Sequence, residues 1–148
     1  MTQEEFIGVL DEKGYSYKIE GDKLVVTRKG YVDLNSLTSL PPDVVFNNGG
    51  GVNLRSLTSL PPDVVFNNVL DVNLNSLTSL PPDVEFKNGG GVDLYSLTSL
   101  PPGVEFNNGG SVYLRSLIGG GFEHWSGNID GIYNKMLLNL MIKQGVFI

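Results

Sequence analysis

The chain repeats one pattern of apolar and polar positions every 20 residues. Four full copies follow one another without insertions, at residues 30–49, 50–69, 70–89 and 90–109. A fifth copy begins at Gly110 and departs from the pattern at Ile118, and a degenerate copy comes first, because Leu24 stands 20 residues before Val44. Self-similarity of this kind is typical of proteins whose repeats stack in a row.

Each copy contains two short stretches in which apolar residues alternate with other residues. Val52 and Leu54 flank Asn53, and Val64 and Phe66 stand two positions apart in the same copy. A period of two predicts strands with one buried face. One 20-residue unit with two short strands cannot close a core alone, so we expect the copies to stack, with parallel strands about 4.8 Å apart.

The residues between the strands predict corners. Pro61 and Pro62 cannot continue a helix, and we interpret the aspartate after them, Asp63, as a turn residue. Asn67 and Asn68, with the glycines of such corners, predict turns with positive φ. The fold class we expect is therefore mainly β: a parallel β-solenoid, with a rod on the order of 25–30 Å long.

Both ends of the solenoid carry sequences that predict caps. Thr2 and Glu5 have capping-box spacing and Gly14 suits the position after a helix, which predicts a helix over residues 3–13. A hairpin around Gly21-Asp22 follows. At the other end, residues 132–143 predict a helix with apolar residues on most of its circumference, which must therefore be buried. We divide the one continuous domain into an N-terminal helix and hairpin cap, a repeat solenoid and a C-terminal helical cap, at residues 1–29, 30–117 and 118–148.

The segment Leu-Thr-Ser-Leu-Pro-Pro at residues 57–62 recurs with Val-x-Leu ahead of it and resembles the short bacterial leucine-rich repeats that carry L-x-x-L-P-x-L-P. The resemblance covers residues 30–117. It departs where that family places asparagine after L-x-L, because Ser56-Leu57 stands there, so both a horseshoe and a straighter solenoid stay open. Residues 127–148 are similar to the tail of small repeat proteins carried by bacteriophages and mobile elements. The first resemblance implies a right-handed coil like that of a leucine-rich repeat, and both resemblances imply an interaction scaffold.

Variable side chains on the outward positions of the strands are the candidates for partner binding. Tyrosine and arginine are frequent where protein interfaces are strongest, and carboxylates and amides accompany them here. An ordinary solvated strand face is the alternative interpretation. The candidates are Asp33, Asn35, Asn53, Arg55, Asn73, Asn75, Asp93, Tyr95, Tyr113 and Arg115 on the first strand, and Glu85 and Glu105 on the second.

The charge of the chain restricts its partners. The formal net charge is −6 and the isoelectric point is about 4.6. Residues 30–109 hold eight acidic residues against Arg55 and Lys87, a net charge of −6, whereas residues 1–29 sum to −1 and residues 110–148 to +1. An acidic rod argues against direct nucleic-acid binding and favours a protein partner with a basic surface. Solubility is the alternative role of the charge.

The candidate chemistry is sparse. The chain has no cysteine and one histidine, and we expect no cofactor and no metal site. No apolar run reaches the length of a signal peptide or a membrane span, so we expect a cytoplasmic protein with no membrane partner.

Three functions stay open. We expect a non-catalytic protein-binding scaffold, encoded by a phage and blocking a host defence protein such as a CRISPR-Cas effector or another nuclease in the host cytoplasm. The second is a self-assembling structural repeat protein or homodimer, with the C-terminal helix as an oligomer or cap interface through Met136, Leu137, Leu140 and Met141. The third is a small hydrolase centred on His124, beside Trp125.

Overall fold

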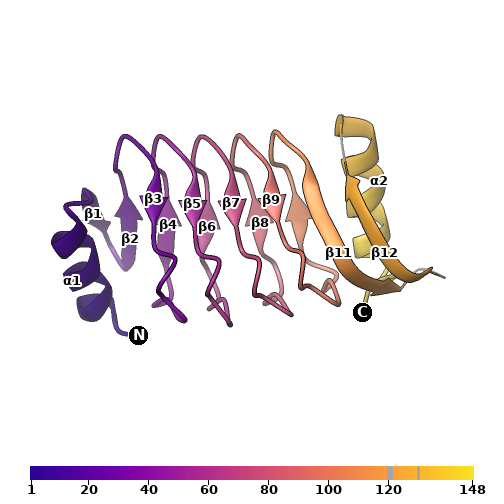
Figure 1. Ribbon diagram of the computed structural model, residues 1–148, viewed down its shortest axis with the longest axis horizontal. Helices are drawn as coiled ribbons and strands as arrows, with labels where there is room; N and C mark the ends of the chain where they lie inside the picture. The colour runs from indigo at the N-terminus through magenta and orange to yellow at the C-terminus, as the bar shows by residue number, and fades with distance from the viewer. Residues whose placement is uncertain (120–121, 130) are drawn as a thin grey trace.

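Two sheets lie face to face along a rod, with one helix at each end (Figure 1). The structure is a computed structural model that describes residues 1–119, 122–129 and 131–148, and the side chains of residues 1–117 and 135–148. Sheet A holds, in spatial order, β1 (Tyr17–Glu20), β2 (Lys23–Val26), β4 (Val44–Phe46), β6 (Val65–Phe66), β8 (Glu85–Phe86) and β10 (Glu105–Phe106). Sheet B holds β12 (Phe122–Ile129), β11 (Val112–Gly119), β9 (Val92–Asp93), β7 (Val72–Asn73), β5 (Val52–Asn53) and β3 (Val32–Asp33).

The 20-residue period sets the register of both sheets. Val32 pairs in parallel with Val52, and Phe46 pairs with Phe66. The phenylalanines of sheet A form one buried column in which neighbouring rings lie 5.2–5.4 Å apart and nearly parallel. The predicted parallel β-solenoid with a stacked apolar core is therefore confirmed.

In three of the four full copies, the residue after the Pro-Pro pair has a left-handed backbone. φ is +61° at Asp43, +63° at Asp63 and +64° at Asp83, which confirms these aspartates as turn residues. The other positive φ angles of the described residues lie outside the repeats. The prediction of positive φ at Asn67, Asn68 and the glycines after such pairs is therefore wrong. Aspartate tolerates this conformation because its short polar side chain bonds locally.

The corner that follows the second strand of each coil places one asparagine inside the rod. This buried column consists of Asn48, Asn68, Asn88 and Asn108, each at most 3% exposed. Asn68 Nδ2 lies 3.1 Å from the carbonyl oxygens of Gly50 and Leu70 and 3.2 Å from that of Asp71, and it donates to all three. Because Gly50 and Leu70 are equivalent positions of successive copies, each amide ties two coils together, as in a leucine-rich-repeat-like asparagine ladder.

The N-terminal cap agrees with its prediction. Helix α1 spans Gln3–Lys13, begins with the capping box of Thr2 and Glu5 and ends at Gly14, which has a φ of +70°. Phe6 and Leu10 of α1 are buried in the core. β1 and β2 form the expected antiparallel hairpin.

Side chains also close the N-terminal edge of sheet B. The backbone N–H of Asp33 in β3 donates to the Tyr15 hydroxyl at 3.3 Å. The Arg28 guanidinium lies 4.4 Å from the centre of the Tyr15 ring and donates to the Tyr31 carbonyl at 2.9 Å. An edge strand whose polar groups already have partners does not recruit another strand.

The C-terminal cap contains a strand that the sequence did not predict. β11 runs past the end of the repeat to Gly119 and pairs antiparallel with β12. The predicted helix over residues 132–143 is confirmed as α2 (Gly131–Lys143), and strand β12 precedes it in the cap. The physical reason is that sheet B ends in an open edge at β11, and β12 covers it.

Helix α2 buries only one of its apolar faces. Leu138 and Ile142 are buried against the solenoid, whereas Met136 is 64%, Leu137 49% and Leu140 51% exposed. The prediction that the whole circumference is buried is therefore wrong for the described part of the helix. In the described part of the chain, no helix combines the length and apolar character needed to cross a membrane.

Candidate functional site

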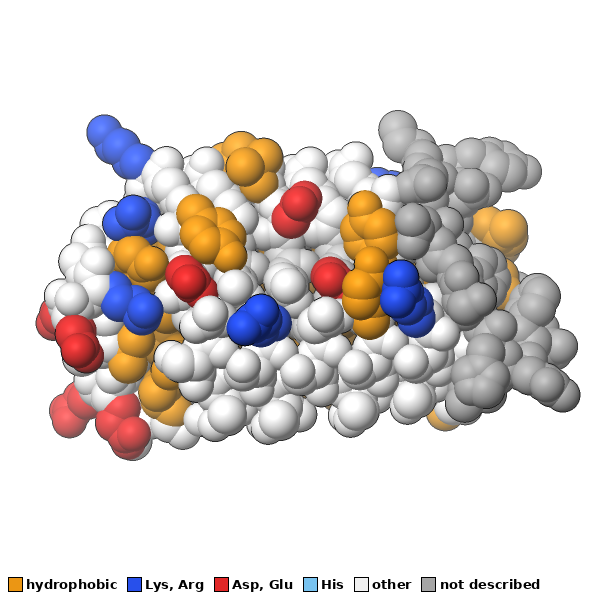
Figure 2. Space-filling view, in the orientation of Figure 1, with side chains coloured by type: hydrophobic (Ala, Val, Ile, Leu, Met, Phe, Trp, Pro, Cys, Tyr) orange, Lys and Arg blue, Asp and Glu red, His pale blue; other side chains and the backbone are white. Residues whose placement is uncertain are grey.

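The structure separates the predicted binding residues into two groups. The ten candidates of the first strand of each coil lie along sheet B, whereas Glu85 and Glu105 belong to β8 and β10 of sheet A. Because the two sheets form opposite sides of the rod, the two groups do not form one surface. Figure 2 shows the face of sheet B, where apolar, acidic and basic side chains lie interspersed.

Part of the polar column on sheet B is used to end the strands. Asp33 Oδ1 accepts the backbone N–H of Asn35 at 3.1 Å, and Asn53 Oδ1 accepts that of Arg55 at the same distance. Asn73 bonds to the backbone of its own coil in the same way. These side chains are half-buried. One oxygen of each is therefore committed to local structure and less of it faces a partner.

Three predicted residues form a cluster at the C-terminal part of this face. The rings of Tyr95 and Tyr113 meet edge to face, with their centres 6.0 Å apart. The Arg115 guanidinium lies 4.5 Å from the centre of the Tyr95 ring. Stacking fixes the orientation of these long side chains before a partner arrives, which lowers the entropy cost of binding.

A groove of about 350 Å³ runs along the same face beside this cluster. Tyr31 borders it at the N-terminal end and Tyr113 at the C-terminal end, with Leu70 and Asp71 between them. Tyr31 and Leu70 are 52% and 54% exposed. The groove thus combines aromatic and aliphatic walls with the carboxylates of Asp71 and Asp93.

Glycines let the two tyrosines lie along the groove. A Cβ atom on Gly51 would lie 3.3 Å from the Tyr31 ring, and one on Gly91 would lie 3.2 Å from the Tyr113 ring. Each ring therefore lies over the glycine of a neighbouring coil and leans toward Leu70 in the middle coil.

The two carboxylates of the groove differ in their partners. Asp71 is exposed and its Oδ1 accepts the backbone N–H of Gly91 at 2.7 Å. Asp93 Oδ1 is buried and accepts no hydrogen bond within the described structure. Burial raises the pKa of Asp93, against the smaller lowering effects of the Tyr95 backbone N–H and the Arg115 charge. A cation placed in the groove would stabilise this carboxylate.

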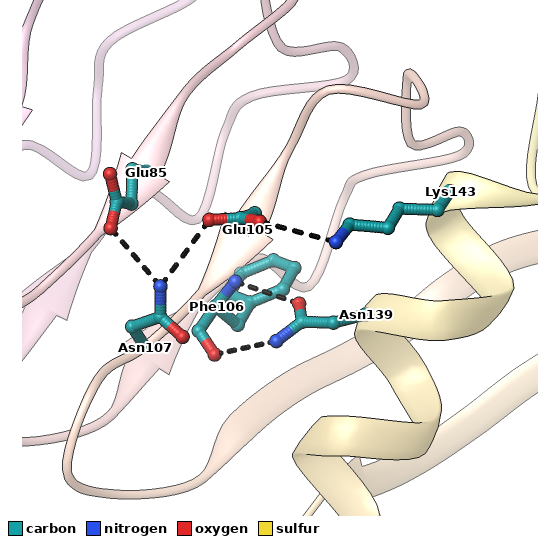
Figure 3. Close-up of polar contacts among 6 residues, drawn as sticks. All are labelled: Glu85, Glu105, Phe106, Asn107, Asn139 and Lys143. Atoms are coloured by element: carbon teal, nitrogen blue, oxygen red, sulfur yellow. Dashed lines mark hydrogen bonds and ion pairs between the residues drawn. The ribbon is translucent and has the colours of Figure 1, made fainter.

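The glutamates of sheet A form a separate charged row (Figure 3). Glu85 and Glu105 pair directly in parallel register, and Asn107 Nδ2 donates to Glu85 at 3.1 Å and to Glu105 at 3.5 Å. Lys87 lies 3.5 Å from Glu85, and Lys143 of α2 lies 3.7 Å from Glu105. The row is therefore internally neutralised, unlike the carboxylates of the groove.

The groove contains several residues that were not among the predicted site residues, and the exposed ones are Tyr31, Leu70 and Asp71. The available signal was a departure from the repeat. The copies around them have glycines at the positions of Val69, Leu70 and Asp71, so these side chains rise above their neighbours.

The hypothesis of a small hydrolase centred on His124 stays a prediction. The side chains of His124 and Trp125 lie outside the described ones. Where the structure does describe side chains, no group of three or more His, Asp or Glu residues could hold a metal ion.

The fold and this surface define the class of protein: a parallel β-solenoid of 20-residue coils with a buried asparagine ladder, similar in this respect to leucine-rich repeats. Comparison with models of protein families, with curated proteins and with solved structures finds no match to the chain.

Proposed function

We propose that this protein is a non-catalytic binding protein whose sheet B face holds a basic segment of another protein. The groove between Tyr31 and Tyr113 carries the proposal, because it places two carboxylates among exposed aromatic and aliphatic side chains. Arginine and lysine side chains suit such a groove: their alkyl stems pack on Leu70 and the tyrosine rings, and their charges approach Asp71 and Asp93.

The acidity of the solenoid supports the same kind of partner. The net charge of −6 on residues 30–109 would attract a basic surface at long range and speed association. Short-range selection would then come from the groove and from the cluster beside it, in which stacking holds Tyr95, Tyr113 and Arg115 in place.

A labelled arginine-rich peptide tests the proposal by fluorescence anisotropy. We expect the double variant Asp71→Asn/Asp93→Asn to weaken binding at least about tenfold, because both charges that face the bound cation are lost. The matched control Asp83→Asn/Glu85→Gln removes the same net charge outside the groove and should change affinity much less. Equal weakening by both double variants would show general charge attraction and reject the groove.

The resemblance to phage repeat proteins favours a host defence protein as the partner. The surface that the solenoid would block is the basic groove in which such a protein binds nucleic acid. We propose this as the physiological target, with a CRISPR-Cas effector or another nuclease as the class to assay. Wild-type protein should inhibit such a nuclease and Asp71→Asn/Asp93→Asn should not. Equal inhibition by the wild-type protein and the double variant would show that the groove is not needed to block the nuclease.

A further inference from the structure

We propose that two copies of this protein associate tail to tail through the outer face of helix α2. Three large apolar side chains stand on that face, those of Met136, Leu137 and Leu140, and each is about half exposed or more. A contiguous exposed apolar patch on a small protein marks an interaction site.

The helix cannot turn this face inward, because its other face is fixed. Asn139 bonds to both backbone groups of Phe106, and Lys135 Nζ donates to the carbonyl oxygens of Asn108 and, at 3.0 Å, Gly110. Leu138 and Ile142 are buried on the same side. Among the described residues, none is left to cover the outer face, and we assign that role to another molecule.

Charge selects a second copy as that molecule. Residues 30–109 carry a net charge of −6, so two copies repel each other side to side, whereas residues 110–148 sum to +1. A depression of about 540 Å³ at the junction of α2 and sheet A is lined by Met136, Leu137 and Leu140, with Glu105 and Lys143 among its other residues. A two-fold interface pairs a patch with itself, and a patch with one charge of each sign does not repel its own copy.

The closed sheet edge makes the assembly finite. The side chain of Asn139 occupies the outward backbone groups of Phe106, so a strand of another copy cannot extend sheet A from β10 at this position. Contact through the helix face of each copy gives a closed dimer rather than a filament.

Sedimentation velocity on the full chain, over about a hundredfold range of concentration, tests the proposal, because dimer formation depends on protomer concentration. We expect a monomer–dimer equilibrium in the wild-type protein. Leu140→Asp should raise the dimer Kd at least about a hundredfold, since each copy loses a buried contact and gains a desolvated charge. Met136→Asp should act in the same direction.

The control is Leu70→Asp, which introduces the same change at a leucine of similar exposure, 54%, on sheet B. It should leave the dimer unchanged, and thermal unfolding should show that all three variants fold. A monomer at every concentration, or a dimer that Leu70→Asp disrupts and Leu140→Asp does not, would overturn the proposal. The first result would leave peptide binding in the groove unaffected, whereas the second would place the dimer contact on the sheet B face.

Discussion

The side-chain amide of Asn139 pairs with both backbone groups of Phe106 as a neighbouring strand would. Its Oδ1 accepts the Phe106 N–H at 2.8 Å and its Nδ2 donates to the Phe106 carbonyl at 2.9 Å (Figure 3). Phe106 is the last residue of β10, the outermost strand of sheet A at this end. One amide thus ends the sheet and attaches helix α2 to it.

Replacement of this amide should loosen the cap. We expect Asn139→Ala to lower the free energy of unfolding by about 1–3 kcal/mol, because two part-buried backbone groups lose their partners. It should also promote aggregation, since the edge of β10 becomes available to other strands. Urea unfolding and light scattering measure the two effects. Gln144→Ala, at an exposed position just after the helix, is the control, and an equal loss in both variants would contradict the role of Asn139.

The asparagine ladder should be sensitive to the chemistry of its side chain as well as to its loss. Asn68→Ala leaves three carbonyl oxygens without this donor and should cost about 1–3 kcal/mol. Asn68→Asp keeps the shape but places a carboxylate against the same oxygens, so it should be worse at pH 7 and recover partly when the pH falls and the carboxylate is protonated.

Chemical denaturation at two pH values compares these variants. Asn67→Ala, at the exposed neighbouring position, is the control and should stay within about 0.5 kcal/mol of the wild type. If Asn68→Asp were as stable as the wild type at pH 7, the amide could not be acting as a donor to the three carbonyls.

The turn at Asp63 should discriminate between side chains by backbone conformation alone. Its φ of +63° suits asparagine or glycine and strains a β-branched residue. We therefore expect Asp63→Asn to be nearly neutral and Asp63→Val to lose about 1–3 kcal/mol in thermal or urea unfolding. Val65→Thr, a half-buried position in β6, reports the cost of an ordinary change nearby. A stable Asp63→Val variant would show that the loop relaxes to another conformation.

The repeat made the coil and its register predictable, because apolar residues separated by 20 positions stack only when Phe46 meets Phe66. The role of Asn68 was not predictable in the same way. An asparagine at such a corner suits either a left-handed turn or a buried donor, and the choice depends on which carbonyls point inward. Sequence periodicity contains no such information.

The candidate site shows the same division. The tyrosine and arginine column was predicted because its members alternate with buried residues, and the structure joins Tyr95, Tyr113 and Arg115. The groove was not predictable from the sequence, because Tyr31 and Tyr113 are far apart along the chain and border one depression only after the coils stack. The exposed face of α2 likewise depends on how Asn139 orients the helix.

The half-buried carboxyl of Asp93 should make stability depend on pH in an unusual direction. Its pKa is raised by burial, so the folded protein holds this proton more tightly than the unfolded chain does. The ionised group therefore costs stability once the pH rises through its folded pKa, and the cost disappears below the usual aspartate pKa of about 4.

The substitution Asp93→Asn removes this cost of ionisation, and asparagine already occupies the equivalent positions 53 and 73. We expect this variant to unfold at a higher temperature at pH 7, by a few degrees at most, because solvent screening keeps the gain below about 1 kcal/mol. The gain should fade as the pH approaches about 4. Calorimetry at both pH values measures it, and Asp71→Asn, which weakens an exposed hydrogen bond to Gly91, should show no gain. A rise in melting temperature that is the same at both pH values would exclude the ionisation of Asp93 as its cause.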